Sequence, residues 1–294
     1  MHPDEVDTSP GLVRSLLVEQ APRWSELPIE LVISHGTDHD IYRIGADLVA
    51  RLPRVGWATA QVSKEREWLH RMAPHLPLAI PVQVYVGEPG AGYPHSWSVC
   101  EWLPGESASA ADLDLDQAAA SLAEFISALR GIDTSGAHPR RTTGRGAPLA
   151  ELDDAVRQAI AELGDRVDGA AVTRCWEESL AAPPSGDEVW VHGDLLPGNL
   201  LVLDGRLSAV IDFGGLNVGD PACDLQPAWN VFAGRSRAIF RAALDVDDAA
   251  WLRGRGWALF QAVLALPYYW ETNTGIVHQA KHALTEILVE AEGR

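Results

Sequence analysis

Short apolar runs divided by turn residues occupy most of the first hundred or so positions of the chain. Residues 31–33, 41–44 and 48–52 are β-prone runs, and segments with glycine and aspartate separate them, which is typical of strands joined by hairpin turns. Further strands are expected around 82–86 and 96–102. A small antiparallel sheet is therefore predicted for this part of the chain.

One helix is predicted among these strands, from about residue 58 to 73. Its apolar residues Val62, Leu69 and Met72 share one face of a helix. Glu65 projects near that face, where an unpaired carboxylate is costly, so a cationic partner is expected for it. The sheet and this helix are predicted to pack together.

After about residue 104 the spacing of apolar residues becomes helical. Helices are expected over residues 112–130, 150–163, 169–181, 226–244, 247–271 and 276–292. Pro267 is expected to kink or end its helix. Residues 131–148 are rich in Gly, Pro, Thr and Arg and are interpreted as an exposed loop, and a strand-rich segment is expected at 189–213.

Length and composition favour two lobes, with a boundary at Leu103-Pro104-Gly105. The chain has 294 residues, of which 47% are hydrophobic, so it can bury a substantial core. We expect one lobe over residues 1–103 and a second over 104–294. The net charge of −18 weighs against nucleic acid as a partner and favours a cationic small molecule.

The sequence disfavours a membrane-spanning or a secreted protein. No stretch has the ~20 apolar residues that a membrane span needs. The first residues lack the basic start and apolar run of a signal peptide. Cys100, Cys175 and Cys223 have no CxxC spacing, so reduced thiols in a cytoplasmic protein are expected. The oligomeric state is left open.

The segment from Val189 to Gly214 carries the candidate chemistry. Asp204-Gly205 lies between two apolar runs and predicts a two-residue hairpin turn. That register puts Asn199 and Asp212 on one face as diagonal neighbours, about 7 Å apart at the backbone. Asp194 precedes the hairpin. An amide oxygen with carboxylates suits Mg²⁺ that carries phosphates and does not suit zinc. Taken singly, an aspartate after a strand is more often part of a turn or a helix cap than a catalyst.

The pattern His-Gly-Asp-x-x-x-x-Asn followed by Ile-Asp-Phe-Gly resembles the aminoglycoside phosphotransferase family, which is similar to the protein kinases. The resemblance continues through Gly-Asp-Pro-Ala-x-Asp-Leu at 219–225. It implies a two-lobed, protein-kinase-like α+β fold. The N-terminal lobe would have a small antiparallel sheet with one main helix, and the larger C-terminal lobe would be mainly helical.

The resemblance also implies roles for the residues of this pattern. Asp194 would accept or orient the proton of the acceptor hydroxyl, while Asn199 and Asp212 would hold Mg²⁺. His192 would brace the loop. Two further carboxylates, Asp220 and Asp224, would either brace the segment after the Mg²⁺ ligands or cap the next helix, and structural and site roles are weighed equally.

The nucleotide site is expected in the first lobe. By the same resemblance Arg51, in a predicted strand, pairs with Glu65 and touches the donor phosphates; protein kinases have lysine at this position. A solvated Glu65 beside Lys64 is the alternative. Three residues of the turn at 34–38, Gly36, Thr37 and Asp38, would contact phosphate, although an ordinary polar turn is the alternative. Glu101 and Leu103 would meet the purine through their backbone, which does not separate ATP from GTP.

By the same resemblance the acceptor is expected in the second lobe. The 15 basic and 28 acidic residues of that lobe agree with a cationic acceptor. Trp270 and Glu271 are candidates for a cation-binding wall, and Asn230 is a weaker one. Each is also explained as a core, interface or surface residue.

The expected activity is a Mg²⁺-dependent transfer of the γ-phosphoryl group of ATP or GTP to a hydroxyl of an aminoglycoside-type antibiotic. A macrolide, another antibiotic or a small metabolite is the alternative acceptor. A nucleotide-binding pseudoenzyme is suggested by Arg51 and the single glycine of the turn. A metal-dependent hydrolase would use the same carboxylates and would release phosphate without an acceptor.

Overall fold

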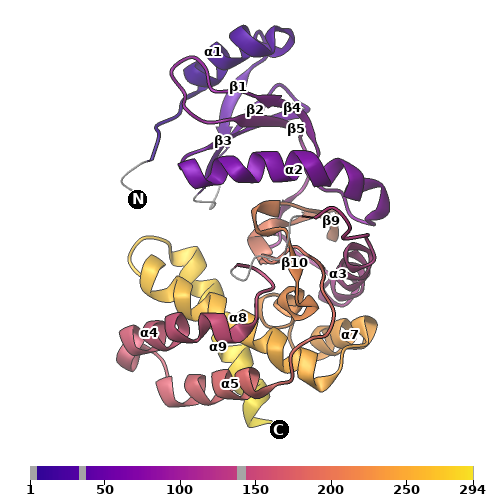
Figure 1. The fold of residues 1–294 in the computed structure, drawn as a ribbon, viewed down its shortest axis with the longest axis vertical. Coiled ribbons are helices and arrows are strands. Elements are labelled where there is room, and N and C mark those ends of the chain that lie inside the picture. The colour runs from indigo at the N-terminus through magenta and orange to yellow at the C-terminus, as the bar shows by residue number, and fades with distance from the viewer. Residues whose placement is uncertain (1–4, 33–37, 138–143, 294) are drawn as a thin grey trace. The chain divides into compact units, whose positions relative to one another are not determined.

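The computed structural model describes residues 5–32, 38–137 and 144–293. These residues form two compact units (Figure 1). One unit holds the described residues up to Glu106 together with Ser208–Gly214, and the other holds Ser107–Leu207 and the described residues from Gly215 onward. The predicted boundary at 103/104 lies close to the first division. Nothing in the sequence pattern predicts that Ser208–Gly214 joins the first unit.

The first unit is built on a five-stranded antiparallel sheet with the order β1-β2-β3-β5-β4. Its strands are β1 (Ile29–Val32), β2 (His39–Ile44), β3 (Leu48–Pro53), β4 (Gln83–Gly87) and β5 (Trp97–Glu101). Each lies at one of the five predicted runs. The prediction of a small antiparallel sheet is therefore confirmed.

Two helices pack on this sheet, α1 (Pro10–Gln20) above it and α2 (Thr59–Met72) below it in the view of Figure 1. Side chains alternate along β3, so Ala50 and Leu52 join the core beneath α1. Arg51 therefore points to the opposite face, which α2 covers. The residues of α2 that were expected on its apolar face, Val62, Leu69 and Met72, are buried.

Helix α1 is absent from the predicted elements, although its signals are present. The Ser9 side chain accepts a hydrogen bond from the Leu12 N–H, and proline occupies the first turn. Its buried residues Val13, Leu16 and Leu17 have the spacing of one helix face. The helix is only eleven residues long, so this pattern covers a few positions and is easily missed.

The second unit is mainly helical. Its helices are α3 (Leu115–Arg130), α4 (Asp153–Leu163), α5 (Gly169–Ala181), α6 (Pro227–Asn230), α7 (Gly234–Leu244), α8 (Asp248–Tyr269) and α9 (Thr274–Glu292). The remaining strands are β6 (Glu106–Ser107), β7 (Val189–Val191), β8 (Leu200–Leu203), β9 (Arg206–Val210) and β10 (Asn217–Gly219). Strand β7 pairs with β10, and β8 lies between β6 and β9.

Helix α8 is the centre of this unit, with α4, α5 and α9 packed against it. This helix is buried on most of its sides, and two of its glycines let neighbouring side chains come close to its backbone. A Cβ at Gly254 would lie 2.5 Å from the Leu225 Cβ, and one at Gly256 would lie 2.6 Å from the Leu149 Cδ1. Pro267 lies inside α8, which ends two residues later at Tyr269. None of the helices in the described ranges is long and apolar enough to cross a bilayer.

The predicted hairpin turn is confirmed by its backbone. Asp204 and Gly205 have φ values of 52° and 76°, and they join the neighbouring strands β8 and β9. The helix expected over 226–244 is instead two helices, α6 and α7, with a break after Asn230.

Candidate active site

The loop between β7 and β8 is held by a buried carboxylate. Asp224 accepts hydrogen bonds from the backbone N–H groups of His192 (2.8 Å) and Gly193 (2.7 Å). Burial raises the pKa of Asp224, against the opposing effects of His192, these two N–H groups and Arg130. The His192 ring is itself buried, and its Nδ1 accepts from the Asp194 N–H at 3.2 Å. Both residues therefore brace the loop.

The Asp194 carboxylate is held by three donors from three parts of the second unit. Its Oδ1 accepts from Arg145 Nη2 at 3.0 Å and from Gln261 Nε2 at 2.8 Å. Its Oδ2 accepts from Asn199 Nδ2 at 3.0 Å. The side chain is still 23% exposed, so a ligand can reach it. A carboxylate held in this way can meet a hydroxyl group in one fixed orientation.

Asn199 turns its amide nitrogen toward Asp194. Nδ2 donates to the Asp194 backbone oxygen at 2.8 Å as well as to Oδ2. Since the amide has one oxygen and one nitrogen, these bonds leave Oδ1 as the atom that a hard cation would ligate. The donor set of Asn199 therefore fits the predicted Mg²⁺ site. Among the described residues, no group of three or more His, Cys, Asp or Glu side chains is arranged to hold a metal ion.

Asp212, in the first unit, has a strained backbone. Its φ is 64°, a value that non-glycine residues adopt at four positions of the described chain. The other three belong to turns or to the end of a helix, where the left-handed conformation is expected. Strain of this kind is concentrated at functional sites. The next segment is fixed locally, because Lys64 Nζ donates to the Gly214 oxygen at 2.8 Å.

The predicted ion pair between Arg51 and Glu65 is present. Arg51 Nη1 lies 2.6 Å from Glu65 Oε2, and the two side chains are 10% and 2% exposed. Burial opposes the charge of Arg51, but Glu65, with Cys100 and Asp212, raises the pKa of Arg51 above its ordinary value. Gln83 Nε2 also donates to Glu65 Oε2, at 3.3 Å. Arg51 is thus a fixed charge on the face of the sheet that α2 covers.

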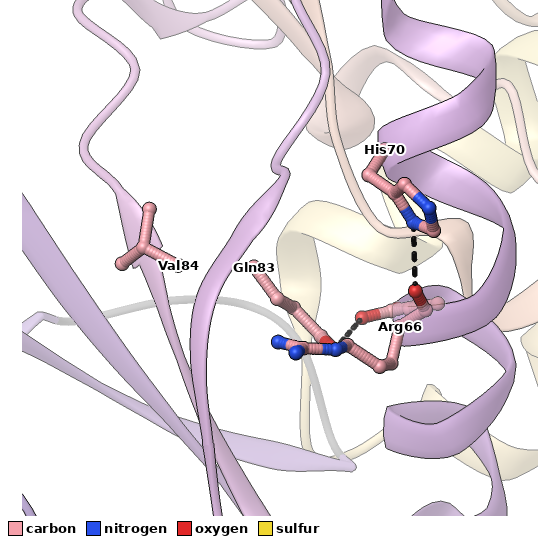
Figure 2. Close-up of a pocket in the computed structure, with 5 residues that line it drawn as sticks. Arg66, His70, Gln83 and Val84 are labelled. Carbon is pink, nitrogen blue, oxygen red and sulfur yellow. Dashed lines mark hydrogen bonds between the residues drawn. The ribbon is translucent and has the colours of Figure 1, made fainter.

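A cavity of about 340 Å³ lies beside this pair, lined by Glu65, Arg66, His70, Gln83 and Val84. Figure 2 shows the Gln83 side chain reaching from its strand toward Arg66, which lies on α2 one turn from His70. His70 Nδ1 lies 2.9 Å from the Arg66 backbone oxygen. The cavity places open space next to the carboxylate that holds Arg51.

His39, at the start of β2, is a buried group that the sequence analysis did not single out. Its pKa is lowered to about 3 by burial and by the charge of Arg51, against the opposite effect of Asp212. The imidazole is therefore neutral at physiological pH. A single histidine in a strand gives no sequence signal for such a position.

Of the remaining predicted nucleotide residues, those that the structure describes lie at or just beyond the ends of strands. Gly36 and Thr37 fall outside the described residues, and Asp38 lies directly before β2. Glu101 ends β5, and the next N–H, of Trp102, donates to the Asp47 oxygen at 2.8 Å. The purine contacts expected of Glu101 and Leu103 stay predictions.

The predicted acceptor residues have different surroundings. Asn230 is buried in α6, with no hydrogen-bond partner for Nδ2 among the described residues. The Trp270 ring already faces two cations of the chain, Arg166 at 4.7 Å and Lys281 at 4.3 Å. Glu271 lies exposed in the turn after α8. Their roles toward an acceptor stay predictions.

Asp220 has a structural role. Its Oδ1 caps the following turn by accepting from the Ala222 N–H at 2.9 Å, and its Oδ2 lies 2.7 Å from Arg253 Nε. Both side chains of this ion pair are nearly buried. This agrees with the bracing or capping alternative of the sequence analysis.

Arg145 and Gln261 are two contacts of Asp194 that the sequence analysis missed. Arg145 belongs to the segment interpreted as an exposed loop, yet its side chain reaches Asp194. Gln261 lies on α8, 67 positions from Asp194. Neither has a spacing signal, since the contacts depend on how distant segments pack. The interpretation of 131–148 as an exposed loop is therefore wrong around Arg145.

The model of the phosphotransferase enzyme family matches residues 31–258. The chain belongs to this family. The matched range includes β2 to β5, α2 and the loop that carries Asp194, so Arg51, Glu65 and Asp194 all lie in it. A search among curated protein sequences finds no match.

Solved structures show that this phosphotransferase has a kinase-like fold. The GDP and kanamycin complex of APH(2")-IIIa is 19% identical with a TM-score of 0.73, covering 96% of this chain and 98% of that chain. The ADP-bound aminoglycoside phosphotransferase APH(2'')-Ib is 17% identical, with a TM-score of 0.60 and coverage of 96% and 97%. Macrolide 2'-phosphotransferase MphH from Brachybacterium faecium is 26% identical, with a TM-score of 0.60 and coverage of 91% and 96%.

Proposed function

We propose that this phosphotransferase is a small-molecule kinase that transfers the γ-phosphoryl group of ATP or GTP to a hydroxyl of an aminoglycoside-type antibiotic. The observation that carries the proposal is the Asp194 carboxylate, held by three donors and still reachable by a ligand. The acidic second lobe suits a cationic acceptor.

The proposed reaction is a direct transfer. The acceptor oxygen forms a bond to the γ-phosphorus while the bond to the β-phosphate oxygen breaks, and ADP or GDP leaves. Asp194 orients the hydroxyl and takes its proton. Arg51, kept charged by Glu65, binds the donor phosphates.

Mg²⁺ is part of this proposal because the donor groups fit it. Asn199 Oδ1 and the Asp212 carboxylate are the oxygen ligands that it prefers. When bound, Mg²⁺ supplies charge neutralisation on the phosphates. Asn199 has a second role, because its amide nitrogen donates hydrogen bonds to Asp194, the proposed base.

The experiment measures Mg²⁺-dependent formation of ADP or GDP by the purified protein over a panel of aminoglycosides and macrolides. We expect turnover that an aminoglycoside stimulates and that Asp194→Ala abolishes. Asp165→Asn is the matched control, because this exposed carboxylate belongs to the same unit. Phosphate release without an acceptor would indicate a hydrolase. Tight nucleotide binding with no turnover for any member of the panel would indicate a pseudoenzyme or a metabolite acceptor outside the panel.

A macrolide is the second candidate acceptor. The macrolide 2'-phosphotransferase is 26% identical, above the two aminoglycoside enzymes named above. The chain's own Arg166 and Lys281 also compete for the Trp270 ring that was expected to bind a cationic acceptor. The same panel decides between them, because stimulation by macrolides alone would replace the aminoglycoside proposal.

A further inference from the structure

The backbone around Arg145 is tied to β10 and to the residue that follows it. Asn217 Nδ2 donates to the Arg145 oxygen at 2.8 Å, and the Asp220 N–H donates to the next oxygen, of Gly146, at 2.9 Å. The stem of Arg145 packs directly on Gly193, where a Cβ would lie only 2.4 Å from the Arg145 Cβ. The arginine is therefore placed by its backbone and by the loop itself, unlike a surface side chain that reaches a site by a rotamer change.

The Arg145 side chain fixes one edge of the Asp194 carboxylate. Its Nη2 and the Gln261 Nε2 both donate to Oδ1, from segments on opposite sides of the loop in sequence. Two donors on one oxygen fix the plane of the carboxylate. The guanidinium is also a full positive charge, 29% exposed, beside the group that meets the acceptor hydroxyl.

The positive charge of Arg145 lies where phosphoryl transfer would bring two negative groups together. An anionic carboxylate that approaches the attacking oxygen also approaches the anionic γ-phosphoryl group, so the two repel each other. Catalysis of this reaction depends on positioning and on neutralising charge. A guanidinium paired with the carboxylate offsets that repulsion, while Gln261 can supply only orientation because it is neutral.

We propose that Arg145 is a positioning residue for the transfer reaction: it orients Asp194 and offsets the negative charge of this carboxylate. The proposal rests on the proposed function. Two other roles are possible for an arginine in this place. It could contact the acceptor directly, or it could cover Asp194 and be displaced when the acceptor binds.

The test compares Arg145→Met and Arg145→Lys with the wild type and with Arg157→Met. Arg157 is the matched control, because it also pairs with an aspartate of the second unit but is 44% exposed on α4. We expect Arg145→Met to lower kcat roughly 100-fold, as for a misplaced catalytic group, with the KM of the nucleotide unchanged. Arg145→Lys keeps the charge, so its kcat should return to about a tenth of the wild-type value or more.

Three outcomes would overturn the proposal. A higher acceptor KM with unchanged kcat would make Arg145 a substrate contact. A higher kcat in Arg145→Met would mean that the arginine covers Asp194. An equal loss in the lysine variant would mean that charge has no part in its role.

A second measurement does not depend on turnover. If the wild type is inactive with every acceptor, the proposed function fails, but the pairing of Arg145 with Asp194 can still be tested. Unfolding of Arg145→Met, Asp194→Asn and the double variant forms a double-mutant cycle. Non-additive shifts in the unfolding midpoint support the pairing, and additive shifts overturn it.

Discussion

Two arginine–carboxylate pairs in this phosphotransferase have different surroundings. Arg51 and Glu65 are 2.6 Å apart with side chains 10% and 2% exposed, whereas Arg145 and Asp194 are 3.0 Å apart with side chains 29% and 23% exposed. The first pair is enclosed between β3 and α2, and the second can be reached by a ligand. We infer that the first pair contributes mainly through a fixed charge in a stable lobe, and the second mainly through the reaction.

The largest expected effect is on the reaction, from Asp194→Asn. The variant keeps the shape of the side chain but removes its charge and its capacity to take a proton, so kcat should fall about 10²- to 10⁴-fold. The free energy of unfolding should change by less than about 1 kcal/mol, because the ion pair is partly exposed and screened. Nucleoside diphosphate formation and denaturant unfolding measure the two quantities. A large loss of stability with little loss of rate would reverse the comparison.

For Glu65→Ala we expect the main loss in folding stability. Removing this carboxylate leaves the buried charge of Arg51 without its partner, which should lower the free energy of unfolding by about 3–5 kcal/mol. The measurement is denaturant unfolding of the variant against the wild type.

A double variant separates stability from function at the same pair. Arg51→Met with Glu65→Leu replaces both charges by apolar groups, so it should recover most of the stability lost in Glu65→Ala. It should still lose nucleotide binding, which isothermal titration with ATP and GTP would measure. Retained binding would show that Arg51 is not a phosphate contact.

The two pairs also differ in how far sequence could predict them. An apolar run predicts the strand that carries Arg51, and apolar spacing predicts the helix with Glu65 near its apolar face, where a carboxylate demands a partner. The resemblance to the kinase-like family then implied that Arg51 is this partner. Arg145 is 49 positions from Asp194, in a segment with no periodicity, so only the packed loop reveals the contact. The hairpin at Asp204 was predictable because its turn chemistry is local.

His39 tests the charge at the first pair through pH. Its folded pKa of about 3 lies below the ordinary 6.5, because of burial and Arg51 and despite Asp212. The unfolded chain therefore binds more protons between these values, so stability is lost as the pH falls from 6.5 toward 3, by up to about 1.4 kcal/mol per pH unit. Over this pH range the free energy of unfolding, measured with denaturant, should change less with pH in His39→Gln than in the wild type. His75→Gln, at an exposed position, should keep the wild-type slope.

The smallest change, Gly193→Ala, sharpens the second pair. Gly193 has φ +79°, and an added Cβ would meet the Arg145 Cβ at 2.4 Å, so Arg145 must move. Gly164→Ala is the matched control, since Gly164 has φ +53° and open space around it. Both variants should lose about 1–2 kcal/mol of stability from left-handed strain, and Gly193→Ala should lose more because of its contact with Arg145. Only Gly193→Ala should lower kcat toward the level of Arg145→Met. If kcat falls equally in both, strain alone explains the loss; if it falls in neither, the placement of Arg145 on the loop has no bearing on the reaction.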